Sequence, residues 1–184
     1  ASCDGAIGVV ALNRDGFKTN YSNFGAALTV STVGGDDSDG AWGPWLADSG
    51  LLTIGNTGLT LPGADDYFFH FGTSFSAPVA SGAASLMLSI NPDLTADQII
   101  AGLKASARPH VRSSVAGVGQ CSESNPGRCV CTSSTCGAGM LDVQQALLYA
   151  QSPASYMPPN WPLVSLDTPE LRADPRPFST PGTY

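Results

Sequence analysis

Apolar residues recur at helical spacing over one long segment in the middle of the chain. From Ser74 to about Ile90 they recur every three or four residues, which is the period of a helix face. The segment is followed by Asn91-Pro92, a pair that ends helices. We therefore expect a helix over this segment. The residues that set the pattern are Val79, Ala83, Leu86, Met87 and Ile90.

Shorter apolar runs before this helix predict strands. Gly5 to Leu12 predicts a buried strand, and Leu28 to Val33 predicts a second one bounded by glycines. The aromatic run Tyr67-Phe68-Phe69-His70-Phe71 predicts a strand that leads into the turn before the helix. The stretch from Trp42 to Leu61 is rich in glycine and short apolar runs, which indicates irregular hairpins.

Two further helices are expected after the central one. Thr95-Ala96-Asp97-Gln98 has the form of a capping box, which opens a helix that runs to about Ser106. Another helix is expected from about Val143 to Gln151. Neither carries an evident chemical group, so we expect both to cover a sheet at the surface.

The composition favours a secreted globular domain. The 184 residues carry a net charge of −7, and only 12% of them are charged. The eight lysines and arginines are spread along the chain and form no basic stripe, so we expect no nucleic-acid partner. The apolar run from Val79 to Ile90 is too short to span a bilayer, so we expect no membrane partner.

The tripeptide Gly72-Thr73-Ser74 places a serine where a flexible turn enters the central helix. Gly72 frees the backbone, and Thr73 is a residue type that caps helices. Pro78 comes early in the helix, where proline is tolerated. At the first turn of a helix, unpaired N–H groups and the helix dipole stabilise negative charge, as acyl transfer requires. An ordinary N-cap is the alternative interpretation of the tripeptide alone.

A longer run around this serine resembles a known motif. Residues Gly72-Thr73-Ser74-Phe75-Ser76-Ala77-Pro78-Val79-Ala80-Ser81-Gly82 resemble the nucleophile motif of subtilisin-like serine proteases, Gly-Thr-Ser-Met-Ala-Ala-Pro-His-Val-Ala-Gly. The departures leave the serine in place. Upstream, Thr19-Asn20-Tyr21-Ser22-Asn23-Phe24-Gly25 resembles the family segment Phe-Ser-Asn-Tyr-Gly. Downstream, Cys136-Gly137-Ala138-Gly139-Met140-Leu141-Asp142-Val143 resembles the close of the catalytic domain.

The resemblance covers about residues 1–150 and implies the C-terminal part of a subtilisin-like catalytic domain. The implied fold is α/β, with three layers and a mainly parallel sheet that an N-terminal segment completes. The implied activity is that of a secreted serine endopeptidase made as a zymogen, which hydrolyses peptide bonds through an acyl-enzyme. Ser74 is the implied nucleophile, and Gly72, Thr73 and Ser74 form the implied nucleophile turn and oxyanion site.

The family's aspartate, histidine and oxyanion asparagine precede the matched region. We therefore expect them on a separate N-terminal segment of the same protease, and the start at Ala1 indicates processing, nicking or trimming. His70 lies in the aromatic stretch expected as a strand and has no evident orienting group, so we do not expect it to be the catalytic base. His110 follows Arg108-Pro109 and is expected in a loop. This chain alone is expected to be inactive, and prone to aggregate without its partner segment.

Five cysteines indicate an oxidising setting, which is extracellular, periplasmic or at the cell surface. Cys3 is isolated, and we expect it to bridge to the missing segment. The sequence does not choose among the three pairings of the other four, and Cys121–Cys129 with Cys131–Cys136 is our working expectation. A zinc site is disfavoured, because Cys129-Val130-Cys131 has neither the usual spacing nor a histidine companion.

Two remaining segments carry no assigned chemistry. Asp36-Asp37-Ser38-Asp39-Gly40 is expected to be a solvated surface turn, with a calcium loop as the alternative. We expect no metal or cofactor in this chain, and calcium stays open for the rest of the complete domain. Eight of the 14 prolines lie in the last 34 residues, so residues 151–184 are expected to form a linker, or a strap on the domain.

Other function classes stay open beside the protease. A catalytically inactive binding module or processed fragment would keep the fold and the serine without turnover. A sedolisin-type serine-carboxyl peptidase also uses a Gly-Thr-Ser turn, with glutamate and aspartate at acid pH, but residues 137–143 favour the subtilisin type. The proline-rich tail is the one hint of a structural or adhesive surface domain.

Overall fold

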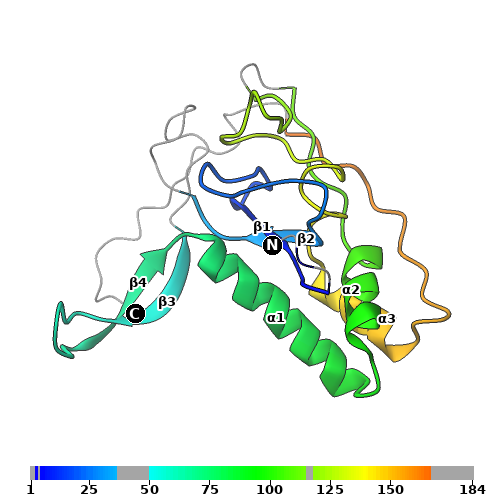
Figure 1. The fold of residues 1–184 in the computed structure, drawn as a ribbon, viewed down its shortest axis with the longest axis horizontal. Helices are drawn as coiled ribbons and strands as arrows, with labels where there is room; N and C mark the ends of the chain where they lie inside the picture. Colours follow the sequence, from blue (N-terminus) through cyan, green and yellow to red (C-terminus); the bar gives the residue numbers. More distant parts are fainter. Residues whose placement is uncertain (1–2, 4, 37–49, 115–117, 167–184) are drawn as a thin grey trace.

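The computed structural model describes residues 3, 5–36, 50–114 and 118–166. Two strands come first, then a strand pair, and then three helices. Helix α1 contacts strands β1 and β2 along part of its length, and helices α2 and α3 also contact it. In Figure 1 the hairpin β3–β4 lies at the N-terminal end of α1, while α2 and α3 lie toward its other end.

Strands β1 (Val9–Leu12) and β2 (Val30–Val33) form a parallel pair, in which Val9 lies opposite Val30 and Leu12 opposite Val33. Both strands are apolar or uncharged and mostly buried, as is typical of parallel strands covered on both faces. The two predicted strands are thus confirmed, although both are shorter than expected.

Strands β3 (Leu51–Asn56) and β4 (Asp65–His70) form an antiparallel hairpin, in which Leu51 lies opposite His70. The Asn56 Oδ1 atom accepts hydrogen bonds from the N–H groups of Gly58 and Gly63, at 2.9 and 2.6 Å, and so closes the loop. The aromatic strand before the turn is confirmed. In place of irregular hairpins, residues 51–56 form a regular strand, and residues 42–49 lie outside the described residues.

Helix α1 (Thr73–Ile90) confirms the central helix and corrects two details of its start. Gly72 is the N-cap, so Thr73 is the first helical residue and not the cap. Pro78 lies inside the helix, beyond the first turn. Because proline has no N–H, the Ser74 carbonyl receives no hydrogen bond from the residue four positions on. The buried residues of α1 are Ser76, Ala80, Ala83 and Met87.

A second apolar stripe follows the length of α1 on a neighbouring face. It consists of Phe75, Val79, Leu86 and Ile90, which are spaced at helical intervals. Leu86 is 48% exposed and Ile90 43% exposed. Helices that are apolar on most of their circumference are typical of domain interiors. The described residues therefore leave a face of α1 that is suited to burial under a further segment.

Helices α2 (Ala96–Ala105) and α3 (Val143–Gln151) pack against each other and against α1. The predicted capping box is confirmed, since the Thr95 hydroxyl accepts from the Gln98 N–H at 3.2 Å and the Gln98 side chain accepts from the Thr95 N–H at 2.9 Å. The core between the helices and the sheet is fully buried at Val30, Met87, Leu103, Ala146 and Ala150.

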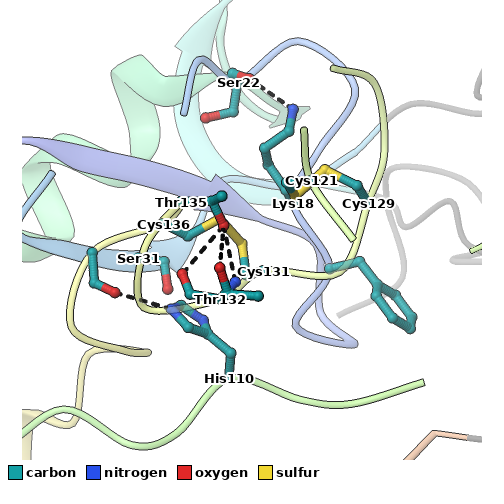
Figure 2. The surroundings of a disulfide bond; sticks show 12 residues. Lys18, Ser22, Ser31, His110, Cys121, Cys129, Cys131, Thr132, Thr135 and Cys136 are labelled. Atoms are coloured by element: carbon teal, nitrogen blue, oxygen red, sulfur yellow. Dashed lines mark hydrogen bonds between the residues drawn. A yellow bond between two sulfur atoms is a disulfide. The ribbon is translucent and has the colours of Figure 1, made fainter. Parts of the chain in front are cut away.

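Two disulfides lie in a second core with strand β1. Cys121 is bonded to Cys129, and Cys131 to Cys136, which are the two local pairs of our working expectation. Figure 2 shows the two bonds close to each other and near Lys18. All four cysteines are buried, and they pack with Val10 and Leu12. Cys3 is exposed and outside these disulfides, so its bridge to another segment stays a prediction.

Asp36, which follows Gly34 and Gly35, is not at the surface as we expected. Asp36 is fully buried, and its carboxylate accepts a hydrogen bond from the Arg128 Nε at 2.5 Å. The expectation of a solvated turn is therefore wrong for Asp36, because a cation 92 positions away in the sequence pairs with it. The rest of that turn, residues 37–40, lies outside the described residues.

Residues 152–166 return along the body of the protein after α3. The Arg112 N–H donates to the Val164 carbonyl, and the Leu166 N–H donates to the Arg112 carbonyl, both at 2.8 Å. The Trp161 ring lies 4.7 Å from the Arg108 guanidinium. This described part of the proline-rich tail is therefore attached as a strap. Across the described ranges, none of the helices is both apolar and long enough to cross a bilayer.

Candidate active site

Ser74 is the second residue of α1, and its side chain is exposed. Among the described residues, no hydrogen bond involves its hydroxyl or its backbone N–H. No acidic side chain lies in the first turn of α1, so the positive end of the helix dipole is not neutralised there. A hydroxyl and a free N–H at this end of a helix suit a nucleophile whose attack creates negative charge.

Gly72 sets the backbone that leads into Ser74. Its φ is +145°, a conformation that favours glycine, although a Cβ built there would make only an ordinary van der Waals contact with the Phe75 ring, at 3.7 Å. The Gly72 carbonyl accepts a hydrogen bond from the Phe75 N–H at 3.0 Å. The conformation of the turn, and not a lack of space, therefore requires glycine at this position.

Tyr21 joins the turn at Gly72, which leads into Ser74, to the end of β2. Its Oη lies 2.8 Å from the Gly34 carbonyl oxygen and 2.6 Å from that of Gly35. The Gly72 N–H donates to Tyr21 Oη and to the Gly34 carbonyl, each at 2.9 Å. The sequence places Tyr21 in a resembling segment but gives it no role, because its partner Gly72 is 51 positions away.

Helix α1 comes close to the end of β2 at Gly34. A Cβ built on Gly34 would lie 2.3 Å from Ser76 Oγ and 2.6 Å from the Ala11 Cβ. Ser76 is fully buried, and its hydroxyl has no hydrogen-bond partner among the described residues. The helix that carries Ser74 is therefore fixed against the sheet by a contact that only glycine permits.

The two histidines are not arranged as a base for Ser74. The His70 ring stacks on the Phe75 ring, with centroids 5.2 Å apart and planes 8° apart. His70 ends strand β4, and His110 lies in a loop, as predicted for both. His110 is buried, its Nε2 lies 3.3 Å from the Gly137 carbonyl oxygen, and burial lowers its pKa.

A buried lysine lies beside the disulfides. The Lys18 Nζ donates to the carbonyls of Thr19 and Ser22 at 2.8 and 2.7 Å, and it lies 5.5 Å from the centre of the Phe24 ring. Figure 2 shows the bond to Ser22. Burial lowers the pKa of Lys18 to about 8, and the charge of Asp36 opposes this shift. The contacts of Lys18 tie together the loop between β1 and β2.

The sulfur atoms of Cys121, Cys131 and Cys136 lie within 4.8 Å of one another. Their disulfides leave no thiolate to bind a metal in this oxidised form. Two cavities of about 280 and 840 Å³ occur in the described part of the chain, and residues 72–74 line neither of them. Thr73 and Ser74 are themselves exposed, and Gly72 is half-buried.

The sequence matches the Subtilase family of peptidases over residues 1–135. The chain belongs to this family. It is 31% identical over 151 residues to an extracellular protease of Xanthomonas campestris pv. campestris, covering 82% of this chain and 20% of that protein. It is 36% identical over 103 residues to a calcium-dependent protease of Nostoc sp., covering 54% of this chain and 16% of that protein.

A solved protease of Pseudoalteromonas arctica PAMC 21717 has the same fold. The TM-score is 0.60 and the identity 30%, over 80% of this chain and 37% of that one. The subtilase chain thus spans about a fifth of the first curated relative and 37% of the solved protease. The expected α/β, subtilisin-like fold class is confirmed, with a parallel sheet of two strands in the described residues.

Proposed function

We propose that this subtilase chain supplies the nucleophile of a secreted serine endopeptidase. The observation that carries the proposal is Ser74, which is exposed at the N-terminus of α1 with neither its hydroxyl nor its N–H engaged among the described residues. The residues around it lie within the range that matches the family. Its substrates are proteins or peptides.

In this mechanism the Ser74 Oγ attacks the carbonyl carbon of the scissile peptide bond. The serine proton passes to a histidine, which an aspartate orients, and the histidine then protonates the leaving amine. Water cleaves the resulting acyl-enzyme and restores the serine. The Ser74 N–H donates to the oxyanion together with an asparagine side chain, and removing one such donor costs about 10²–10³ in rate.

The aspartate, histidine and asparagine are proposed to lie on an N-terminal segment of the same protease. Three observations support this partner. The described residues offer Ser74 no base, the relatives extend well beyond the matched part, and α1 carries an exposed apolar stripe. The N-terminal segment would cover that stripe and complete the sheet.

A secreted location is proposed on two grounds. Both disulfides are buried in a core, which suits an oxidising compartment, and one relative is named an extracellular protease. Another relative is named a calcium-dependent protease. We propose that any calcium site of the complete enzyme lies elsewhere in that enzyme, and among the described residues the Asp36 carboxylate already pairs with Arg128.

Covalent labelling of the complete protease tests the proposal. The protein, comprising this chain and the N-terminal segment, is treated with a fluorophosphonate at neutral pH, and the labelled peptide is identified by mass spectrometry. We expect the probe on Ser74 and no labelling of Ser74→Ala. Ser85→Ala is the matched control, because Ser85 is an exposed serine on the same helix.

The other outcomes of the labelling experiment distinguish the alternative functions and test the expected Cys3 bridge. Failure of the intact protease to react would indicate an inactive binding module. Reaction only at acid pH would indicate a serine-carboxyl peptidase. If a second chain separates only on reduction, the bridge expected from Cys3 is supported.

A further inference from the structure

We propose that the Tyr21 hydroxyl is the positioning group that holds the nucleophile turn on the end of β2 and so sets the rate at which Ser74 is acylated. The inference rests on the proposed function, since it concerns the same serine. It goes beyond that function by giving a role to a side chain that does not itself react.

The Tyr21 hydroxyl contacts three main-chain groups from two distant segments. It shares its single proton between the carbonyls of Gly35, at 2.6 Å, and Gly34, at 2.8 Å. Its oxygen accepts from the Gly72 N–H at 2.9 Å. Phenylalanine would keep the ring in place and lose all three contacts.

Gly72 depends on groups outside the helix for its orientation. It is the N-cap of α1 but has no side chain that could cap the helix, and its φ lies at +145°. Its N–H is held from outside by Tyr21 and by Gly34, while its carbonyl accepts from Phe75. Fixing this N–H therefore fixes the plane of the Phe71–Gly72 peptide, from which the chain enters Thr73 and Ser74.

The groups that hold Tyr21 are themselves tightly packed. A Cβ on Gly34 would meet Ser76 of α1, and a Cβ on Gly35 would lie 2.5 Å from the Gly50 Cα. The rings of Tyr21 and Phe71 lie 6.0 Å apart, just before the turn. The hydroxyl thus connects a rigid strand end to the turn that carries the nucleophile.

Loss of the hydroxyl should loosen the turn without unfolding the protein. The bond from the Gly72 N–H to the Gly34 carbonyl remains, and so does the contact between Gly34 and Ser76. A displacement of the order of 1 Å at a reacting group can cost about a hundredfold in rate. We expect a smaller loss for Tyr21→Phe, because one of the two bonds to Gly72 survives.

The test compares Tyr21→Phe with Tyr67→Phe in the complete protease. Tyr67 is an exposed tyrosine of the hairpin whose hydroxyl makes no hydrogen bond among the described residues, so its variant controls for loss of a phenol. The acylation rate is measured by stopped flow with an ester substrate, together with kcat and KM. We expect acylation and kcat to fall about tenfold in Tyr21→Phe, with KM changed by less than about twofold.

A second measurement reads the hydrogen bonds directly and needs no catalysis. Amide exchange at Gly72 is followed in the same proteins, and we expect about tenfold faster exchange in Tyr21→Phe, with Val79 unchanged. Equal acylation and equal exchange in the two tyrosine variants would overturn the inference, as would a rise in KM with unchanged kcat. If the wild type is not labelled at Ser74, the proposed function fails first, and the exchange result shows separately whether the hydroxyl holds the turn.

Discussion

At the scale of single residues, the buried polar atoms that lack partners are the sensitive points of this chain. Ser76 and His110 each have a side-chain atom, Oγ and Nδ1 respectively, that is buried without a hydrogen-bond partner among the described residues. Burying such an atom costs stability, because its hydrogen bond to water is lost and not replaced. Both residues therefore give measurable effects with conservative substitutions.

Ser76→Ala is expected to stabilise the protein. The substitution removes a buried hydroxyl that has no partner among the described residues, where α1 packs against Gly34, and this should raise the free energy of unfolding by about 1 kcal/mol. Alanine is also the better helix former, so Ser85→Ala, at an exposed position of the same helix, measures that contribution separately. Urea unfolding of both variants gives the difference, and equal gains would contradict the argument from burial.

His110 should make stability depend on pH below neutrality. Because burial lowers its pKa below 6.5 in the folded protein, the unfolded chain binds a proton at a higher pH than the folded one. The free energy of unfolding is therefore fully retained above pH 6.5 and falls as the pH drops below it. Unfolding curves from pH 7.5 to 5 should show a weaker fall for His110→Gln than for the wild type, and an equal fall in the two proteins would contradict this expectation.

At the scale of elements, local signals decide where the helices begin and end. The Thr95 and Gln98 bonds close within three residues, so the sequence contains all of the information that defines the start of α2. Helix α1 differs, because Gly72 offers no side-chain cap and its turn is held by Tyr21 and Gly34. The two helix starts should therefore respond differently to local substitutions.

Thr95→Ala should destabilise the protein by about 1 kcal/mol, the usual cost of losing an N-cap side chain. Thr60→Ala removes the same atoms from an exposed loop and should leave stability unchanged. Chemical denaturation followed by circular dichroism makes the comparison. An equal effect of the two substitutions would mean that the capping box adds nothing to folding.

The difference between local and distant contacts explains which features could be predicted from the sequence. The helices, the capping box and the strand before Gly72 follow from neighbouring residues, and all are confirmed. The role of Tyr21 and the burial of Asp36 do not follow, because their partners lie 51 and 92 positions away. The serine turn was found from its motif, whereas the group that holds it has no local signature.

At the scale of the whole molecule, the exposed apolar surface is the dominant feature. The stripe on α1 and the hairpin β3–β4 expose large hydrophobic side chains, among them Ile54 at 80% and Leu86 at 48%. Surfaces of this kind mark interfaces or promote aggregation. The arrangement agrees with a chain whose partner segment completes the domain.

The chain alone is expected to leave a fluorophosphonate unreacted, and labelling is expected to appear when the N-terminal segment is supplied. The reason is that, among the described residues, no side chain hydrogen-bonds the Ser74 hydroxyl, and the His70 ring stacks on Phe75. Gel fluorescence with and without the segment makes the comparison. Robust proteolysis by the isolated chain that is lost in Ser74→Ala would show this expectation to be wrong.

Polar substitutions in the apolar stripe of α1 test whether this face causes self-association of the isolated chain and also binds the N-terminal segment. Leu86→Ser with Ile90→Ser should reduce dye binding and self-association of the isolated chain, because both side chains are exposed there. The same pair should weaken association with the N-terminal segment. Leu148→Ser on α3 is the control, since that exposed leucine lies on a helix expected to face solvent in the complete domain.

The buried position of Lys18 makes the folded protein selective toward amine reagents. The chain contains two lysines, and Lys104 is exposed on α2, whereas Lys18 is enclosed by main-chain carbonyls and the Phe24 ring. Under pulsed reductive methylation, Lys104 should be modified at once, while Lys18 reacts only in molecules that have opened. The ratio of modified Lys18 to modified Lys104 would therefore report how often the region around β1 and the disulfide core opens. Lys104 serves as the internal standard, because it is exposed in every molecule.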